Sequence, residues 1–174
     1  MGLNLPEPVE AVFRAFHTCE FATLAKDGAP IVWPTAPLYL PDRGQFLITT
    51  CIALPQKAFN IRRTPRVSLL FSNPTASGLD HPPAVLVQGD ATISDEIVTW
   101  SDDLAVYWPR LHRLQPIGKL YSANVVTRWL MDWYFMRLLI YITPRAIRWW
   151  PDGDFGQAPR TVEMASTKEA PDVE

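Results

Sequence analysis

The sequence predicts an α+β domain that is mainly β, with antiparallel strands and a few peripheral helices. Three observations support this class. The chain has 17 prolines, several of which punctuate short apolar runs, as at Pro34, Pro37 and Pro41. An Asp-Gly pair at 27–28 separates two extended runs, which is a hairpin signature. The connections between the first apolar runs are short, and short connections favour antiparallel pairing.

Size and charge exclude several classes of function. The chain has 174 residues, of which 48% are hydrophobic, so it can form one domain with a packed core. Residues 1–151 carry 14 basic and 12 acidic side chains, a net charge of +2, whereas residues 152–174 carry 2 and 6, a net charge of −4. No part of the chain is basic enough to follow a phosphodiester backbone, so we expect no nucleic-acid partner.

Membrane and metal chemistry are also disfavoured. The most apolar stretch, 125–142, is interrupted by three charged side chains, which are costly in a lipid core, so we expect no membrane span. The two cysteines, Cys19 and Cys51, cannot form a disulfide framework or, with only three scattered histidines, a metal site. The N-terminus shows no signal-peptide pattern, and these features together predict a cytoplasmic protein.

The first third of the chain predicts one short helix and three strands. Residues 7–16 follow a proline and place apolar side chains at helical spacing, so we expect a helix that caps an open barrel end. Two extended runs, 21–25 and 31–40, flank the Asp-Gly turn, and a third strand at 45–50 follows a turn at 41–44. These strands predict an antiparallel meander.

The middle of the chain predicts a strand–helix–strand step. A helix at 55–63 has proline in its first turn and ends at Thr64-Pro65. A strand at 66–71 follows it directly. After a turn-rich loop, residues 84–94 predict a longer strand, in which Gly89 is a candidate for a β-bulge.

The last part of the chain predicts two helices and two strands. Apolar positions at helical spacing indicate helices at 97–111 and 125–134, so residues 95–136 form a helical insertion. The tryptophans of this insertion favour a core or dimer-contact stripe, and the floor of an apolar substrate pocket is the alternative. Apolar runs at 138–142 and 146–150 flank a proline and predict two closing strands.

The C-terminal segment predicts no structure of its own. Residues 152–174 are acidic and have little apolar content, so burial cannot offset the entropy of ordering them. We therefore expect a folded domain at 1–151 and a disordered acidic tail at 152–174. The folded part then has six or seven strands and three or four helices.

Several segments between about residues 8 and 96 occur in an order shared with a known family. They are 20–25, the Asp-Gly turn, 30–34, 46–50, Lys57, 60–69 and 85–91. This ordered set resembles the pyridoxamine 5′-phosphate oxidase-like superfamily. The resemblance implies a six-stranded antiparallel split β-barrel with peripheral helices that forms a homodimer. It also implies FMN, or in one branch the deazaflavin coenzyme F-420, bound between subunits, and hydride transfer to or from a small organic substrate.

The helix expected at 55–63 is a candidate site for the cofactor phosphate. A helix N-terminus has unpaired amides and partial positive charge, which favour an anion. Lys57 lies in the first helical turn and adds a full charge there, although a solvated surface lysine is the alternative. Nearby polar residues that can add contacts are Thr49, Thr50, Cys51, Gln56 and Asn60. Asn60 shares the helical face of Lys57.

Three arginines near this helix have open roles. At about 100° per residue, Arg62 and Arg63 lie roughly 140° and 240° around the helix from Lys57. The two arginines therefore cannot easily serve one phosphate together. Arg66 begins the next strand and is a candidate for a phosphate contact or an intersubunit ion pair, and a structural role is the alternative for each arginine.

The resemblance places the flavin ring beside the second strand. Trp33, Pro34 and Thr35 would border the ring, with the indole as an aromatic wall and Thr35 as a hydrogen-bond partner. The alternative for Trp33 is interface packing. Gln88, in the strand at 84–94, is a further candidate because a buried amide needs partners.

Other functions are less well supported, and no catalytic residue is assigned. The C-terminal part lacks the Arg-Leu-x-Pro ending of the true oxidases, so vitamin B6 oxidation is not expected, and Phe59 replaces a position that is often basic in the deazaflavin branch. A non-catalytic flavin- or haem-binding protein is an alternative, although the histidines His17, His81 and His112 are scattered. A hydrolase is disfavoured because no Gly-x-Ser-x-Gly elbow is present, and the acidic pairs Asp95/Glu96 and Asp102/Asp103 fit helix starts.

Overall fold

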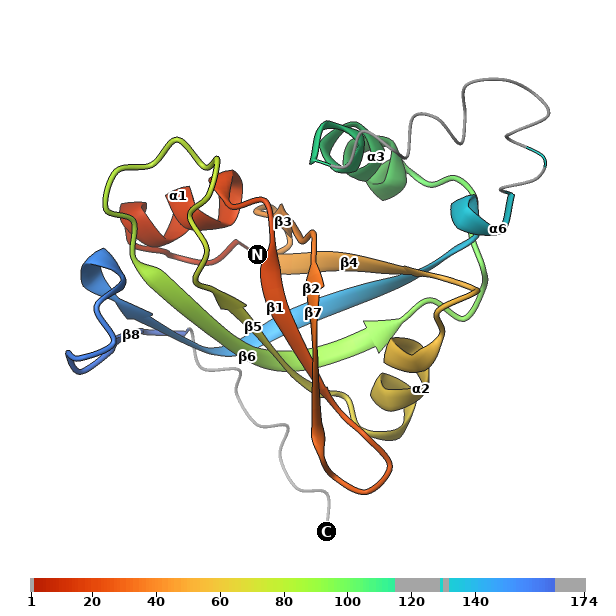
Figure 1. Cartoon of the computed structure of the whole chain (residues 1–174), viewed down its shortest axis with the longest axis horizontal. Coiled ribbons are helices and arrows are strands. Elements are labelled where there is room, and N and C mark those ends of the chain that lie inside the picture. Colours follow the sequence, from red (N-terminus) through yellow and green to blue (C-terminus); the bar gives the residue numbers. More distant parts are fainter. Residues whose placement is uncertain (1, 115–128, 130–131, 165–174) are drawn as a thin grey trace, which may run out of the picture.

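The computed structural model contains one curled sheet in which every strand pair is antiparallel (Figure 1). The described residues are 2–114, 129 and 132–164. Their strands are β1 (Cys19–Leu24), β2 (Pro30–Thr35), β3 (Leu38–Leu40), β4 (Gln45–Cys51), β5 (Arg66–Phe71), β6 (Ala84–Ile93), β7 (Arg137–Trp150) and β8 (Arg160–Val162). The strand order is β2-β1-β5-β6-β7-β4-β3, and β8 pairs with β7. The two end strands, β2 and β3, are consecutive in the chain, so the sheet must curl to bring its ends close together.

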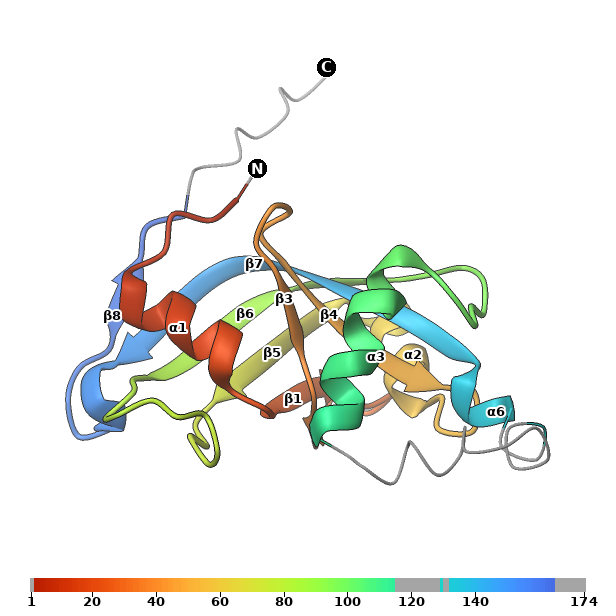
Figure 2. The same ribbon diagram turned by 90° about the horizontal axis from the view of Figure 1, so that it is seen from above.

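Helices lie around this sheet. Those of the described residues are α1 (Glu7–Ala15), α2 (Gln56–Arg63), α3 (Asp102–Leu114) and α6 (Asp132–Phe135), with a short 3-10 helix η1 (Pro151–Gly153) before β8. β3 lies between α1 and α3, and α2 lies at the other end of the sheet from α1 (Figure 2). In the part of the chain that the structure describes, no helix is long and apolar enough to cross a membrane.

The main core lies on the inner face of the curled sheet and under α1. α1 buries Val9, Val12 and Phe13, as its apolar spacing predicts. The Phe13 ring lies 4.7 Å from the Phe46 ring of β4, edge to face, and 5.1 Å from the Phe71 ring of β5. α1 therefore joins strands that are distant in sequence, and the prediction of a helix over an open end of the sheet is confirmed.

A second, smaller core lies on the outer face of the sheet. α3 buries Leu104, Tyr107 and Leu111 against a group that includes Leu38 and Leu47. The helix begins at Asp102 rather than at the predicted residue 97, because the Ser101 hydroxyl accepts the Leu104 N–H at 3.1 Å and caps it. The prediction of a helix start at the Asp102/Asp103 pair is confirmed. The same prediction for Asp95/Glu96 is wrong, because these residues form a bend before the isolated bridge of Val98 with Arg137.

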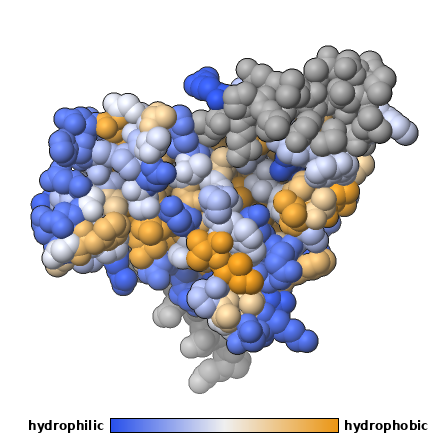
Figure 3. Space-filling model, viewed as in Figure 1, coloured by the Kyte–Doolittle hydropathy of each residue, from blue (hydrophilic) through white to orange (hydrophobic). Residues whose placement is uncertain are grey.

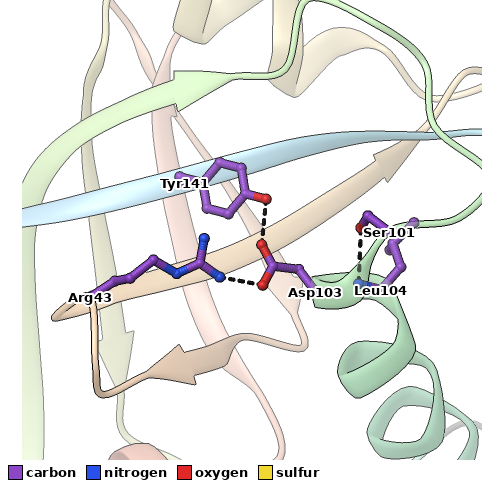
Figure 4. A network of polar contacts seen from close by, with 5 residues as sticks. All are labelled: Arg43, Ser101, Asp103, Leu104 and Tyr141. Carbon is purple, nitrogen blue, oxygen red and sulfur yellow. Dashed lines mark hydrogen bonds and ion pairs between the residues drawn. The ribbon is translucent and has the colours of Figure 1, made fainter.

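A polar network fixes the start of α3 to the sheet (Figure 4). The Asp103 carboxylate accepts a hydrogen bond from the Tyr141 hydroxyl of β7 at 2.6 Å. It also forms an ion pair with Arg43, which precedes β4. Burial, together with the hydrogen bond to Asp103, raises the pKa of Tyr141 to about 12. Both carboxylate oxygens of Asp103 therefore have a partner, and they hold the start of α3 against the sheet.

The expected six strands are a wrong count, because the structure has eight in its described residues. Ala36 and Pro37 divide the run predicted at 31–40 into β2 and β3 at opposite ends of the sheet. The two strands predicted at 138–142 and 146–150 are one strand, β7. Proline is tolerated inside β7 because Pro144 lies opposite Gly89, where the register shifts and the ladder is interrupted. The irregularity predicted at Gly89 is confirmed, but the extra residue is Arg145 of β7, opposite the Gln88–Gly89 step.

The segment predicted as a disordered tail is structured up to residue 164. β8 pairs with β7, and Val162 is buried in the main core opposite Ile147. Apolar content is low in this segment, but one buried valine and a strand pairing anchor it. Residues 165–174 lie outside the described residues, as does most of the helix predicted at 125–134.

Candidate functional site

The candidate site is centred on Lys57 in the first turn of α2. Its ammonium nitrogen lies 5.0 Å from the ring centroid of Trp33 on β2, a cation–π contact. Burial lowers the pKa of Lys57, and the nearby charge of Arg137 lowers it further. Within the described residues Lys57 forms no ion pair with a carboxylate. A partly buried cation without a counter-ion is a favourable place for an anionic ligand.

The backbone at the start of α2 adds to this positive site. The N–H groups of residues 56–58 donate to no backbone carbonyl of the described chain, and Pro55 provides no side-chain cap. The first turn contains no acidic residue. These amides and the helix dipole therefore favour an anion at the same place as Lys57.

The end of β4 supplies polar groups that are buried. Thr50 and Cys51 are buried, and the Thr50 hydroxyl donates to the Leu54 carbonyl at 2.7 Å, which closes the turn before α2. The Thr49 hydroxyl is buried close to the Tyr107 hydroxyl of α3. It keeps hydrogen-bonding capacity for a ligand, since a hydroxyl has one donor and two acceptor positions.

Asn60 and Gln56 have structural contacts that the sequence did not predict. Asn60 is fully buried, and its amide nitrogen donates to the Thr23 hydroxyl of β1 at 2.9 Å. Its carbonyl oxygen accepts from Gln56 at 3.0 Å and from Arg63 at 2.9 Å. Asn60 therefore anchors α2 to the sheet, and both ends of its side-chain amide are hydrogen-bonded within the protein.

β2 divides the predicted ring-contact residues between its two faces. Trp33 and Thr35 share the face of Phe21 and Cys19, their partners on β1, as the alternation predicts. The Thr35 hydroxyl lies 3.4 Å from the Cys19 sulfur, and burial raises the pKa of the Cys19 thiol to about 12. Pro34 is exposed on the other face. Trp33 is therefore the residue of this group that the structure brings to Lys57.

Gln88 lies apart from Lys57, on the outer face of the sheet. It is exposed and lines a groove of about 340 Å³ with Arg66 and Arg145. Both arginines pair with Asp90, at 3.1 and 3.5 Å. The Gln88 amide was expected to be buried, and it is not, because its position on β6 alternates with the core-facing ones.

Arg137, at the start of β7, is a site residue that the sequence did not identify. It is only 7% exposed, and its guanidinium lies 4.4 Å from the Tyr134 ring centroid and 4.9 Å from that of Trp108. Its Nε and Nη2 atoms have no hydrogen-bond partner. The sequence signal for Arg137 is a charge inside an apolar run.

The described residues contain no group of three His, Cys, Asp or Glu side chains that could hold a metal ion. The site therefore consists of cations, amides and aromatic rings. This set of donors fits a phosphate-bearing aromatic nucleotide, since the amides and Lys57 match a dianion and Trp33 matches a flat ring.

Comparisons with solved structures identify related folds. A conserved hypothetical protein from Mycobacterium tuberculosis is 21% identical, with a TM-score of 0.54 and coverage of 97% of each chain. A heme binding protein from Mycobacterium smegmatis is 17% identical, with a TM-score of 0.55, over 91% of this chain and 60% of that one. An F420 reductase is 19% identical, with a TM-score of 0.51, over 82% and 98%. At these identities the similarity establishes the fold.

The sequence itself gives the family. No curated protein matches it significantly. The family model described as pyridoxamine 5′-phosphate oxidase matches residues 5–148, which include the sheet from β1 to most of β7 and the residues around Lys57. The chain therefore belongs to the pyridoxamine 5′-phosphate oxidase-like family.

Proposed function

We propose that this protein binds FMN, or the deazaflavin coenzyme F-420, and transfers hydride to or from a small organic substrate. The observation that carries the proposal is the uncompensated charge of Lys57, which lies over the Trp33 ring at the open N-terminus of α2. When bound, the cofactor supplies the hydride chemistry, and the protein supplies binding and orientation. Membership of a family that includes oxidoreductases supports the same conclusion.

The proposed roles follow from the chemistry of each group. Lys57 and the amides of residues 56–58 bind the phosphate, since charge-assisted hydrogen bonds are the strongest available there. Trp33 forms one wall for the ring, and the Thr49 hydroxyl provides a donor or acceptor. Asn60 acts indirectly, because its contacts to Thr23 and Arg63 keep α2 in position.

Removal of the Lys57 charge tests the site. We expect Lys57→Ala to weaken cofactor binding by about 1.5–3 kcal/mol, the value of a hydrogen bond to a charged group. Purified protein is titrated with FMN and with F-420, and the dissociation constants are measured by calorimetry. Arg62→Ala is the matched control, because Arg62 is exposed on the same helix, and it should leave the affinity unchanged. Equal affinities for both variants and the native protein would place the phosphate elsewhere.

We further propose that the functional form is a homodimer. Within one chain, Gln88 lies apart from Lys57, on the outer face of the sheet. A cofactor that contacts Lys57 of one subunit and Gln88 of another therefore requires a dimer. The outer face of β2 offers a contact surface, because Val32 is 55% exposed between Pro30 and Pro34, which are also exposed. An apolar patch is visible where β2 crosses the centre of the molecule (Figure 3). Apolar patches of this kind are typical of interfaces.

The mass in solution tests the dimer. Light scattering coupled to size exclusion should give twice the chain mass of 19.7 kDa. Val32→Asp should shift the protein to the single-chain mass, because a charge buried in the contact is costly. Val106→Asp makes the same change at a valine of α3 that is 59% exposed, and the dimer should persist. A native monomer, or a dimer retained by Val32→Asp, would contradict the proposal.

A further inference from the structure

We propose that Arg137 is the receptor for the carboxylate of a flat aromatic or conjugated acid, and that such acids are the substrate class of this protein. The substrate part of this inference rests on the proposed redox function, whereas the binding site itself does not. The site comprises the guanidinium of Arg137, the rings of Trp108 and Tyr134, and the hydroxyl of Thr49.

The unpartnered atoms of Arg137 have the geometry that a carboxylate requires. Nε and Nη2 are the two nitrogens of one edge of the guanidinium, and both are buried without a hydrogen-bond partner. Two parallel N–H groups on one edge bind the two oxygens of a carboxylate in the bidentate mode. A buried charge without a partner is costly, so its retention indicates a ligand that completes it.

No carboxylate of the described chain pairs with this guanidinium. Asp103, on the neighbouring α3, is already bound by Arg43 and Tyr141 (Figure 4). The other positive group nearby, Lys57, is close enough for Arg137 to lower its pKa. The local charge is therefore positive, and no carboxylate of the described residues competes with an incoming acid for Arg137.

The surroundings of Arg137 favour a flat ligand. Aromatic rings of α3 and α6 cover the guanidinium, and the ring centroids of Trp108 and Tyr134 are 5.9 Å apart. A conjugated ring can stack on such surfaces, with the acid group directed at Arg137. Because the donor atoms are shielded, entry requires these side chains to shift. Trp108 and Tyr134 are only half-buried, so a ligand can reach their rings from solvent.

Thr49 supplies a third polar group on the same face of the sheet. Cys51 lies directly opposite Arg137 in the β4–β7 pair, and Thr49 is two residues earlier on β4. Alternate residues of a strand share a face, so the Thr49 hydroxyl lies on the side of Arg137. A diagonal neighbour of this kind is about 7–8 Å away between Cα atoms, within reach of an arginine side chain and a small ligand.

The cofactor phosphate fits the other half of the site better. The start of α2 has several free amides and Lys57, which suits a dianion. Arg137 offers one fork of two free N–H groups, which suits a single negative charge. Lys57 therefore binds the nucleotide phosphate, and Arg137 binds the substrate carboxylate.

Calorimetric titration with benzoate tests the site. Native protein should bind benzoate and bind the neutral isostere benzamide at least about tenfold more weakly. Arg137→Gln should weaken benzoate binding about 10- to 100-fold, and Arg137→Lys, which keeps the charge but not the fork, should give an intermediate loss. Arg62→Gln is the matched control and should not change the affinity. Loss of an unpaired buried charge should not lower the melting temperature of the Arg137→Gln variant.

A parallel titration separates this proposal from the cofactor proposal. Inorganic phosphate, FMN and F-420 are titrated into Arg137→Gln and Lys57→Ala. We expect Arg137→Gln to bind the nucleotide and Lys57→Ala to bind benzoate, each close to the native affinity. If native protein does not bind benzoate, binds benzamide equally well, or binds benzoate unchanged in Arg137→Gln, the carboxylate site is wrong. If phosphate or nucleotide binding depends on Arg137 and benzoate binding does not, Arg137 serves the cofactor. If benzoate binds as expected and neither nucleotide binds, the site stands and the redox function fails.

Discussion

Phe13→Ala is expected to lower the free energy of unfolding by about 3–5 kcal/mol, the usual cost of removing a buried aromatic side chain. Phe13 is 1% exposed, and its ring contacts those of Tyr39, Phe46 and Phe71. These rings come from α1 and three strands, so the cavity left by the substitution would lie between the helix and the sheet. The backbone around the ring is fixed by the strand ladders, which limits how far the site can collapse.

Urea denaturation followed by circular dichroism measures this loss. The midpoint should fall while the slope of free energy against urea stays the same, since the folded architecture is retained. Arg14→Ala is the neighbouring control. Arg14 forms an exposed ion pair with Glu10 one turn earlier, which contributes about 0.3–0.5 kcal/mol. Similar losses for the two variants would show that the aromatic cluster is not the main support of α1.

Gly89→Ala is expected to destabilise the fold by about 3 kcal/mol, at the upper end of the usual cost of overpacking. A Cβ at this position would collide with the Thr143 carbonyl oxygen and lie 3.0 Å from the Thr143 carbonyl carbon and 3.2 Å from the Pro144 Cα. These are backbone atoms of β7, which cannot move without opening the β6–β7 pair. Gly89 is therefore required for close approach of two strands, and not for a left-handed conformation.

Gly28→Ala provides the comparison for this variant. Gly28 has a φ of 85° in the β1–β2 turn, and a Cβ there meets nothing within 4 Å. Its replacement should cost about 1 kcal/mol, from backbone conformation alone. Thermal unfolding of both variants should show that Gly89→Ala lowers the melting temperature more than Gly28→Ala does. An equal or reversed order would mean that β7 adjusts to the added methyl group.

The local part of the candidate site could be predicted from the sequence. The strand end at Thr50, the proline before α2 and the position of Lys57 in the first turn are all defined by neighbouring residues. The sequence could not show that Asn60 faces Thr23 rather than a ligand, because that contact joins residues far apart in the chain. It could not separate Gln88 from Lys57 either, since the curl of the sheet determines which strand faces meet.

Arg137 also shows the difference between what the sequence predicts and what depends on the tertiary structure. Its charge and its apolar neighbours are visible in the sequence, but its lack of a partner depends on everything packed around it. Cys51 is its register partner on β4, and Trp108 and Tyr134 cover it from separate helices. A buried arginine can be recognised as unpaired only when all its neighbours are known.

The sequence alone determined the elements whose signals are local, namely α1, the turn at Gly28, α2 and the irregularity at Gly89. Each depends on the spacing, backbone preference or capping of a few adjacent residues. The tertiary structure decided the features that depend on distant pairing. β7 continues through Pro144 because the strand bulges there, with Arg145 left out of the register with β6, and β8 is ordered because Val162 reaches the core. Local sequence does not encode these outcomes, because their free energy comes from contacts that exist only after the sheet has curled.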